Sequence, residues 1–313
     1  MPTAQAAPPD LHQTLTALIH GRAKTGKSLM AASLTKPLLY LDVELGAQFL
    51  PMARRVWDPS TPIPRMDGTW DTAVVRCTSW DDAEAALDQV RSRAHPFKGI
   101  AVDSLQALQN RLIGKVAGPT SAVEIQQWGE ILRMLQNFTE GLRDMTNHKR
   151  WPVMEVLVTC PTSLRDGTWG PHLRGQMGII APYLFDLTGY LYVEDEFNRK
   201  TNATVQVRKL RTRRTKDIEA GERVGGKIPA IYTLPMVTGT PEEVRKANLT
   251  FRKLRADVYR RVDGAPVGIA PPVPSEPPAP PASPPPSGGP APDVPAQPVT
   301  PTGTATPKET TNG

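Results

Sequence analysis

The chain has 313 residues and a formal net charge of +6, and 17 of its 34 prolines fall within residues 265–313. That segment has almost no Leu, Ile, Phe or Trp to offset the entropy of ordering it, which excludes a single globule over the whole chain. We therefore predict a flexible N-terminus at 1–10, one large domain at 11–264 and a disordered Pro/Ala-rich tail at 265–313. The tail is typical of a solubilising spacer or, alternatively, of an extended docking strip for a partner.

Charge and cysteine content limit the class of protein further. Residues 265–313 carry a net charge of −2 and residues 1–264 carry a net charge of +8, which together give the overall +6. The positive charge of residues 1–264 is compatible with a polyanionic partner. The two cysteines, Cys77 and Cys160, form no disulfide framework and indicate a reducing compartment. Neither a long apolar run nor a secretory pattern is present in the sequence, so we expect no membrane contact and a cytoplasmic location.

The first motif with chemical content follows a short, β-prone apolar run at 14–20. The sequence GRAKTGKS at 21–28 matches G-x-x-x-x-G-K-S, and a helix is predicted directly after it, as a phosphate-binding P-loop requires. Loop N–H groups would surround phosphate oxygens, Lys27 would reach the β- and γ-phosphates, and the Ser28 hydroxyl would bind Mg²⁺. A glycine turn without a ligand is the alternative. The predicted nucleotide-binding residues are Gly21, Arg22, Ala23, Lys24, Thr25, Gly26, Lys27, Ser28 and Leu29.

A second apolar strand, predicted over 38–43, ends beside two carboxylates. Glu44 follows the strand at its carboxyl end, where open α/β sheets bind ligands. We therefore predict that Glu44 polarises the water that attacks the γ-phosphate. Asp42 competes for this role, because it lies two residues earlier on the same side of the strand.

A third apolar strand, predicted over 100–102, ends in Asp103 and Ser104. An apolar strand that ends in Asp downstream of a P-loop is typical of the second half of a nucleoside triphosphate site. We therefore predict that Asp103 holds Mg²⁺ together with Ser28.

Two amphipathic helices flank that strand in the sequence. The first begins after Ser79, and the second begins at a capping-box pair formed by Ser121 and Glu124. The second helix has an apolar stripe at helical spacing, which is more typical of core than of a partner surface. The stripe consists of Val123, Trp128, Ile131, Leu132, Leu135, Phe138 and Leu142.

A further strand, over 153–160, ends in Thr159 and Cys160, where a polar side chain can sense the γ-phosphate. We predict a glycine-rich loop at 161–178 after it. Its aromatic and basic side chains are those that sequence-tolerant binding of single strands uses, although an ordinary surface loop has the same composition. The predicted DNA-binding residues of this loop are Arg165, Trp169 and Arg174.

The last third of the domain is predicted to contain a β-hairpin, with a turn at 197–202 between two alternating strands. The second strand enters a basic run with six positive charges in the nine residues 208–216. The run is either a solvated face or a phosphate-binding surface, for nucleic acid or for ATP on a neighbouring subunit. Arg208 and Arg211 are the predicted DNA contacts, and a basic helix is predicted over 241–262.

The strings GRAKTGKS, LLYLDVELG and GIAVDSLQAL occur in this order, and residues 11–240 resemble the RecA-like P-loop ATPases. Among these, the chain is most similar to phage nucleotide-binding proteins, which include single-strand annealing ATPases. The resemblance implies an α/β fold with a mostly parallel central sheet flanked by helices, followed by the C-terminal hairpin.

The resemblance also implies roles for individual residues. It makes Glu44 the base that activates water, and it makes Thr159 or Cys160 the sensor, although the family more often has an amide there. It further implies that Lys216 or Arg213 acts as a finger on the nucleotide of a neighbouring subunit.

These roles define one leading hypothesis, an ATP- and Mg²⁺-dependent ATPase that acts on single-stranded DNA in phage recombination or replication, through strand annealing. Its partners would be single-stranded DNA, further copies of itself in a ring or filament, and a single-strand DNA-binding protein, within the cytoplasm of a bacterial host. A nucleotide-gated interaction module that hydrolyses little ATP and recruits a partner through the tail is the alternative. A small-molecule kinase is a third hypothesis.

Overall fold

The computed structural model describes residues 13–118, 122–198, 202–234 and 250–260. All of them belong to the first of two compact units, Met1–Arg261 and Val262–Gly313, into which the chain divides. The segments predicted as a flexible N-terminus and a disordered tail lie outside the described residues.

The described strands form one central sheet in the order β11-β9-β8-β1-β6-β5-β2-β4-β3, with β10 paired to β8 and β7 paired to β6. From β1 to β3 all neighbours are parallel, and β8 is parallel to β1, whereas β9, β10 and β11 are antiparallel to their partners. The strands are β1 Leu15–Gly21, β2 Leu38–Asp42, β3 Arg54–Val56, β4 Thr72–Arg76, β5 Gly99–Asp103, β6 Glu155–Arg165, β7 Thr168–Pro171, β8 Leu187–Asn198, β9 Ala203–Arg211, β10 Gly221–Glu222 and β11 Ile231–Leu234.

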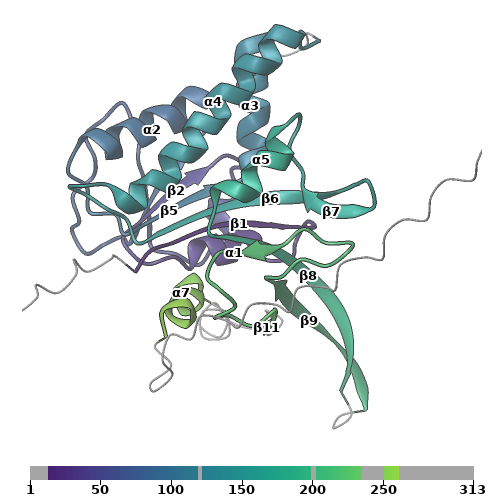
Figure 1. Cartoon of the computed structure of the whole chain (residues 1–313). Helices are drawn as coiled ribbons and strands as arrows, with labels where there is room; N and C mark the ends of the chain where they lie inside the picture. The colour runs from purple at the N-terminus through teal and green to yellow at the C-terminus, as the bar shows by residue number, and fades with distance from the viewer. Residues whose placement is uncertain (1–12, 119–121, 199–201, 235–249, 261–313) are drawn as a thin grey trace, which may run out of the picture. The chain divides into compact units, whose positions relative to one another are not determined.

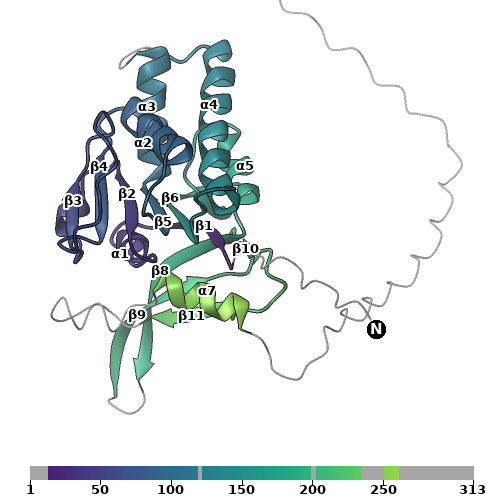
Figure 2. The same ribbon diagram turned by 90° about the vertical axis from the view of Figure 1, so that its left-hand side faces the viewer.

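Helices cover both faces of this sheet, with α2, α3, α4 and α5 on one face and α1 and α7 on the other (Figures 1 and 2). The helical segments are α1 Lys27–Ala32, η1 Ala47–Phe49, α2 Trp80–Ser92, α3 Leu105–Ala117, α4 Ile125–Asp144, η2 Met145–Asn147, α5 Met177–Leu184 and α7 Phe251–Tyr259. No helix in the described ranges has the length and apolar character needed to cross a bilayer.

The strand sequences explain this layered arrangement. Along β1, Leu18 packs into the core beneath α2–α5, whereas Ala17 and Ile19 pack into the core on the side of α1 and α7. Because successive side chains enter opposite cores, the central strands must be apolar at almost every position. The predicted α/β fold, with a mostly parallel central sheet flanked by helices and a C-terminal hairpin, is confirmed.

The strand order places the functional segments at one edge. The P-loop follows β1, and Asp103 ends β5, with only β6 between these two strands. On the other side of β1, β8 is paired as far as Gly21↔Leu191 and continues to Asn198, so the β8–β9 hairpin extends past the P-loop (Figure 1). The carboxyl ends of β1, β5 and β2 therefore lie at a common edge.

The prediction of a loop over 161–178 was wrong. β6 continues to Arg165 and forms a hairpin with β7, and α5 begins at Met177. The hairpin turn is formed by Asp166 and Gly167, with φ values of +48° and +79°. An Asp-Gly pair between β-prone residues favours a two-residue hairpin turn, so the signal was present in the sequence.

The predicted helix starts have mixed outcomes. Ser79 caps α2 through a capping box with Asp82, as predicted. For α4, Ser121 lies outside the described residues, and the capping box is formed by Glu124 with Gln127.

The helix predicted over 241–262 is described only as Phe251–Tyr259. Phe251 donates its N–H to the Ser33 hydroxyl at 2.9 Å. The Arg255 guanidinium lies 3.2 Å from the carboxylate of the fully buried Glu155 on β6. Apolar side chains of this helix fill the core beside α1, so α7 is part of the domain.

Candidate nucleotide site and basic edge

The P-loop has the backbone that its glycines predict. It runs from the end of β1 into α1, and Gly26 has a φ of +97°, a left-handed value that favours glycine. A side chain at Gly26 would also collide with the guanidinium of Arg208. Lys27 donates from Nζ to the carbonyl oxygens of Gly21 at 3.0 Å and Arg22 at 2.8 Å, so its ammonium lies within the loop.

The electrostatics around Lys27 bring the predicted catalytic groups together. Burial lowers the pKa of Lys27, and the nearby carboxylates of Asp103 and Glu44 act in the opposite direction. Both carboxylates therefore face the P-loop ammonium, as expected if all three act on one triphosphate.

A hydrogen-bonded cluster surrounds the Asp103 carboxylate. Asp103 accepts from the Tyr40 hydroxyl at 2.6 Å through one carboxylate oxygen and from the Thr159 hydroxyl through the other. The Ser28 side chain lies near the Tyr40 hydroxyl and acts to lower the pKa of Tyr40. Burial, followed by the Asp103 charge, raises the pKa of Tyr40 well above its usual value, so Tyr40 remains a donor.

The structure distinguishes the two carboxylates at the end of β2. Asp42 accepts from the backbone N–H groups of Gly46 at 2.9 Å and Ala47 at 3.0 Å, so both its oxygens hold the turn into η1. Glu44 is exposed and accepts from the hydroxyl of Ser104, directly after Asp103. This geometry favours Glu44 over Asp42 as the group that faces a nucleotide.

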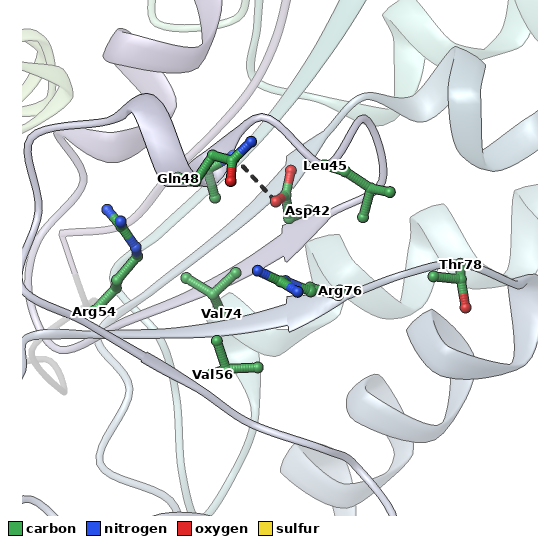
Figure 3. A pocket seen from close by; sticks show the side chains of 9 residues that line it. Asp42, Leu45, Gln48, Arg54, Val56, Val74, Arg76 and Thr78 are labelled. Carbon is green, nitrogen blue, oxygen red and sulfur yellow. Dashed lines mark hydrogen bonds between the residues drawn. The ribbon is translucent and has the colours of Figure 1, made fainter.

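A cavity of about 280 Å³ lies beside Asp42 and is lined by Gln48, Arg54 and Arg76 among others (Figure 3). Arg54 and Arg76 belong to β3 and β4, whereas the P-loop lies on the other side of β2. The Asp42 carboxylate therefore lines a cavity on the β4 side of β2 and not the space above the P-loop.

Only one of the two predicted sensor residues reaches the site. The Thr159 hydroxyl contacts Asp103, whereas the buried Cys160 thiol donates to the His172 carbonyl at 3.7 Å. Since successive side chains on a strand point to opposite faces, a site above one face contacts one of the two residues.

The predicted DNA-binding groups gather beside the P-loop, around the β6–β7 hairpin. The guanidinium of Arg22 lies 4.9 Å from the ring centroid of Trp169 on β7. The backbone of Trp169 is bonded to that of Asp217 at 2.8 Å and of Glu219 at 2.9 Å, so the basic segment 212–219 lies against the hairpin. The exposed cations of the hairpin, of the turn that follows it and of segment 212–219 are Arg165, Arg174, Arg213, Arg214 and Lys216.

Two residues of the basic run are placed differently from the other cations. Arg208 is only 5% exposed and lies against Gly26 of the P-loop, so it does not belong to an exposed surface. Arg211 is half-buried in β9. Arg213 and Lys216, in contrast, follow the end of β9 and are exposed.

The comparisons with known proteins agree with this site. Residues 13–224 match a family described as an AAA domain. The chain belongs to this AAA domain family. No curated protein matches the chain. Among solved structures, the flagellar accessory protein FlaH from Methanocaldococcus jannaschii is similar, with 11% identity over 72% of this chain and 86% of that chain and a TM-score of 0.33.

The AAA domain is a P-loop ATPase domain. The P-loop of this chain fits ATP, and the side-chain oxygens of Asp103 and Ser28 fit Mg²⁺. Asp103 and Ser28 carry the oxygen ligands that Mg²⁺ prefers, and the Tyr40 hydroxyl, which donates to Asp103, lies near Ser28. Within the described residues, no group of three His, Cys, Asp or Glu side chains could hold a metal ion. The remaining ligands of a bound Mg²⁺ would therefore be nucleotide phosphates and water.

Sequence reasoning missed two residues of this AAA domain. Tyr40 is a tyrosine within a fully buried strand, and its hydroxyl needs a partner there, which is a signal that the sequence contained. His20 is buried at the end of β1, where Nε2 bonds to the Glu219 carbonyl at 2.7 Å and Nδ1 lies 3.2 Å from the Thr162 hydroxyl. Nothing in the local sequence predicts these two distant partners.

Proposed function

We propose that this AAA domain is an ATP- and Mg²⁺-dependent ATPase that acts on single-stranded DNA and anneals complementary strands in phage recombination or replication. The observation that carries the proposal is the contact between Arg22 of the P-loop and Trp169 of the aromatic and basic hairpin. It links the phosphate-binding loop directly to the group best suited to stack on an unpaired base.

The residues at the carboxyl edge have different roles in ATP hydrolysis. Lys27 and the loop N–H groups bind the triphosphate, and Glu44, oriented by the Ser104 hydroxyl, positions the attacking water and accepts its proton. Mg²⁺, when bound, neutralises charge on the β- and γ-phosphates. The Thr159 hydroxyl, bonded to Asp103, would report the presence of the γ-phosphate to the β6–β7 hairpin.

The Arg22–Trp169 contact suggests how DNA alters turnover. A base that stacks on Trp169 competes with Arg22 for the same ring, and Arg22 belongs to the loop that holds the phosphates. DNA binding would thus change the position of a P-loop residue, and ATP binding would change the affinity of the hairpin for DNA.

An assembly of several copies is the second part of the proposal. Lys216 is exposed, and its backbone bonds to Thr168 of the hairpin beside the P-loop, while Arg213 is exposed in the same segment. We infer that one of these cations reaches a triphosphate on a neighbouring copy. A cation supplied in this way stabilises the charge that develops during phosphoryl transfer.

The test combines ATP hydrolysis, with and without single-stranded DNA, with annealing of complementary oligonucleotides. We expect DNA to change turnover, and Glu44→Gln to reduce turnover by about 100-fold or more while nucleotide binding is retained. Asp88→Asn, which alters an exposed carboxylate on α2, is the matched control and should be fully active. A fully active Glu44→Gln protein would exclude Glu44 as the base, and turnover indifferent to DNA would exclude the coupling.

A further inference from the structure

A second cavity, of about 340 Å³, lies between α3, α4 and the turn that follows β7. Its walls are mostly apolar and include Ile131, Leu132 and Met177, and Trp128 belongs to the same wall. Trp128 was predicted to be a core residue, but it is only half-buried. A large, flat aromatic side chain therefore lines an open, concave space.

The rim of this cavity is held in place by a buried side chain. Gln109 on α3 is 1% exposed and bonds to both backbone groups of Arg174, accepting from its N–H at 2.7 Å and donating to its carbonyl at 3.0 Å. Gly175 has a φ of +63°, and a Cβ there would lie 3.8 Å from the Trp128 ring. The turn thus runs close to the indole, while the Arg174 side chain is exposed at the rim.

We propose that this cavity receives one unpaired base of single-stranded DNA, stacked on Trp128, with the adjoining phosphate bound by Arg174. The inference rests on the proposed function, since it presumes that the domain binds single-stranded DNA. The volume lies at the lower end of the range for small-ligand sites, about 300–1,000 Å³, which suits a single heterocycle. Every base offers a π-face, so stacking on Trp128 requires no particular sequence.

The surroundings of the cavity favour a base over an apolar protein segment. Arg174 at the rim and Arg165 on the preceding hairpin are both exposed cations, which match a phosphate backbone. The Gln176 amide lines the cavity and can bond to polar groups on the edge of a base. An apolar peptide would pack against the apolar walls of the cavity. It would offer no negative charge to Arg174 and Arg165 and no hydrogen-bonding partner to the Gln176 amide.

Helix α3 connects this cavity to the catalytic edge. Ser104, which donates to Glu44, is the N-cap of α3, and the same helix carries Gln109 one and a half turns later. The backbone that positions Arg174 is therefore bonded to the helix that begins at the nucleotide site.

The experiment measures binding of the full chain to two labelled oligonucleotides, an oligothymidylate and an abasic strand of equal length, by fluorescence anisotropy at fixed salt. We expect the wild type to prefer the oligothymidylate, and Trp128→Leu to weaken that binding by about 5- to 150-fold, since base–aromatic stacking is worth about 1–3 kcal/mol. Binding of the abasic strand should not change. Trp128→Phe should restore most of the preference, and Trp151→Leu, at a half-buried tryptophan outside the cavity, is the matched control.

Each outcome separates this inference from the proposed function. Binding of neither strand by the wild type would overturn both. Binding that Trp128→Leu leaves unchanged, or weakens equally for both strands, would overturn the cavity alone. Photocrosslinking of wild type to an oligonucleotide with 5-iodouracil needs no variant, and adducts found only away from Trp128 would also reject the inference.

Discussion

Two regions of the domain satisfy their charged groups in different ways. In the nucleotide region, Asp103 is buried, and its two carboxylate oxygens accept hydrogen bonds from Tyr40 and Thr159. In the basic region, around the β6–β7 hairpin and segment 212–219, Arg174, Arg213 and Lys216 are exposed. The first region is therefore held in place by the chain itself, whereas the cations of the second region are open to an external anion, as the proposed function requires.

Two contacts connect these regions. The Arg22 guanidinium of the P-loop lies over the Trp169 ring, and His20 at the end of β1 bonds to the segment that follows the basic run. Variants that damage one region, the other or their junction should therefore have distinguishable effects.

The largest expected effect is in the nucleotide region. Lys27→Ala should reduce kcat/KM for ATP by about 100-fold or more, because it removes the ammonium that stabilises charge on the phosphates. Steady-state hydrolysis and nucleotide titration measure this. Lys98→Ala is the control, since Lys98 is an exposed lysine directly before β5, at the end of that strand opposite Asp103. Equal losses in the two variants would contradict a specific role for Lys27.

Tyr40→Phe should have an intermediate effect. It removes the hydroxyl that donates to Asp103 and leaves a buried carboxylate oxygen without that donor. We expect about a tenfold higher Mg²⁺ concentration for half-maximal turnover, from the 1–3 kcal/mol cost of an unsatisfied buried group. Magnesium titrations of turnover test this, with Tyr192→Phe on β8 as the control. An unchanged magnesium dependence would show that Tyr40 does not position the ligands.

A smaller effect is expected from the basic region. Replacing both Arg213 and Lys216 with Ala should weaken binding of single-stranded DNA and reduce the slope of log K against log salt by about 2, one for each lost phosphate contact. ATP binding should be retained, because the Arg213 guanidinium contacts the Gly226 carbonyl and the Lys216 side chain is exposed to solvent. A salt series of oligonucleotide binding measures the slope. An unchanged slope with lost turnover would assign these cations to a neighbouring nucleotide instead of DNA.

The smallest effect at neutral pH is expected at the junction. Burial lowers the pKa of His20 to about 4, against 6.5 for an exposed histidine. Below pH 6.5 the unfolded chain binds a proton there that the folded chain does not, so stability falls as the pH drops from 6.5 towards 4. Between pH 6.5 and 5, wild type should lose about 2 kcal/mol more unfolding free energy than His20→Gln. Urea unfolding at both pH values tests this, and parallel losses would mean that His20 is not the titrating group.

Much of the nucleotide region could be predicted from sequence because its signals are local. The glycines and Lys27 of the P-loop occupy one short segment, and Asp103 directly ends an apolar strand. The basic region was predicted less well. Arg208 lies within β9 against the P-loop, whereas Arg213 follows the end of that strand and is exposed, and the local sequence does not mark where β9 ends within the basic run.

The sequence by itself determined the elements, since apolar runs, glycine positions and caps act over a few residues. It also determined that a triphosphate site lies at the end of the first strand. Only the tertiary structure decided that Tyr40 donates to Asp103, that Trp169 lies beneath Arg22, and that Trp128 lines a cavity with Arg174. These contacts join residues far apart along the chain, so they depend on strand order and packing, which local propensities do not encode.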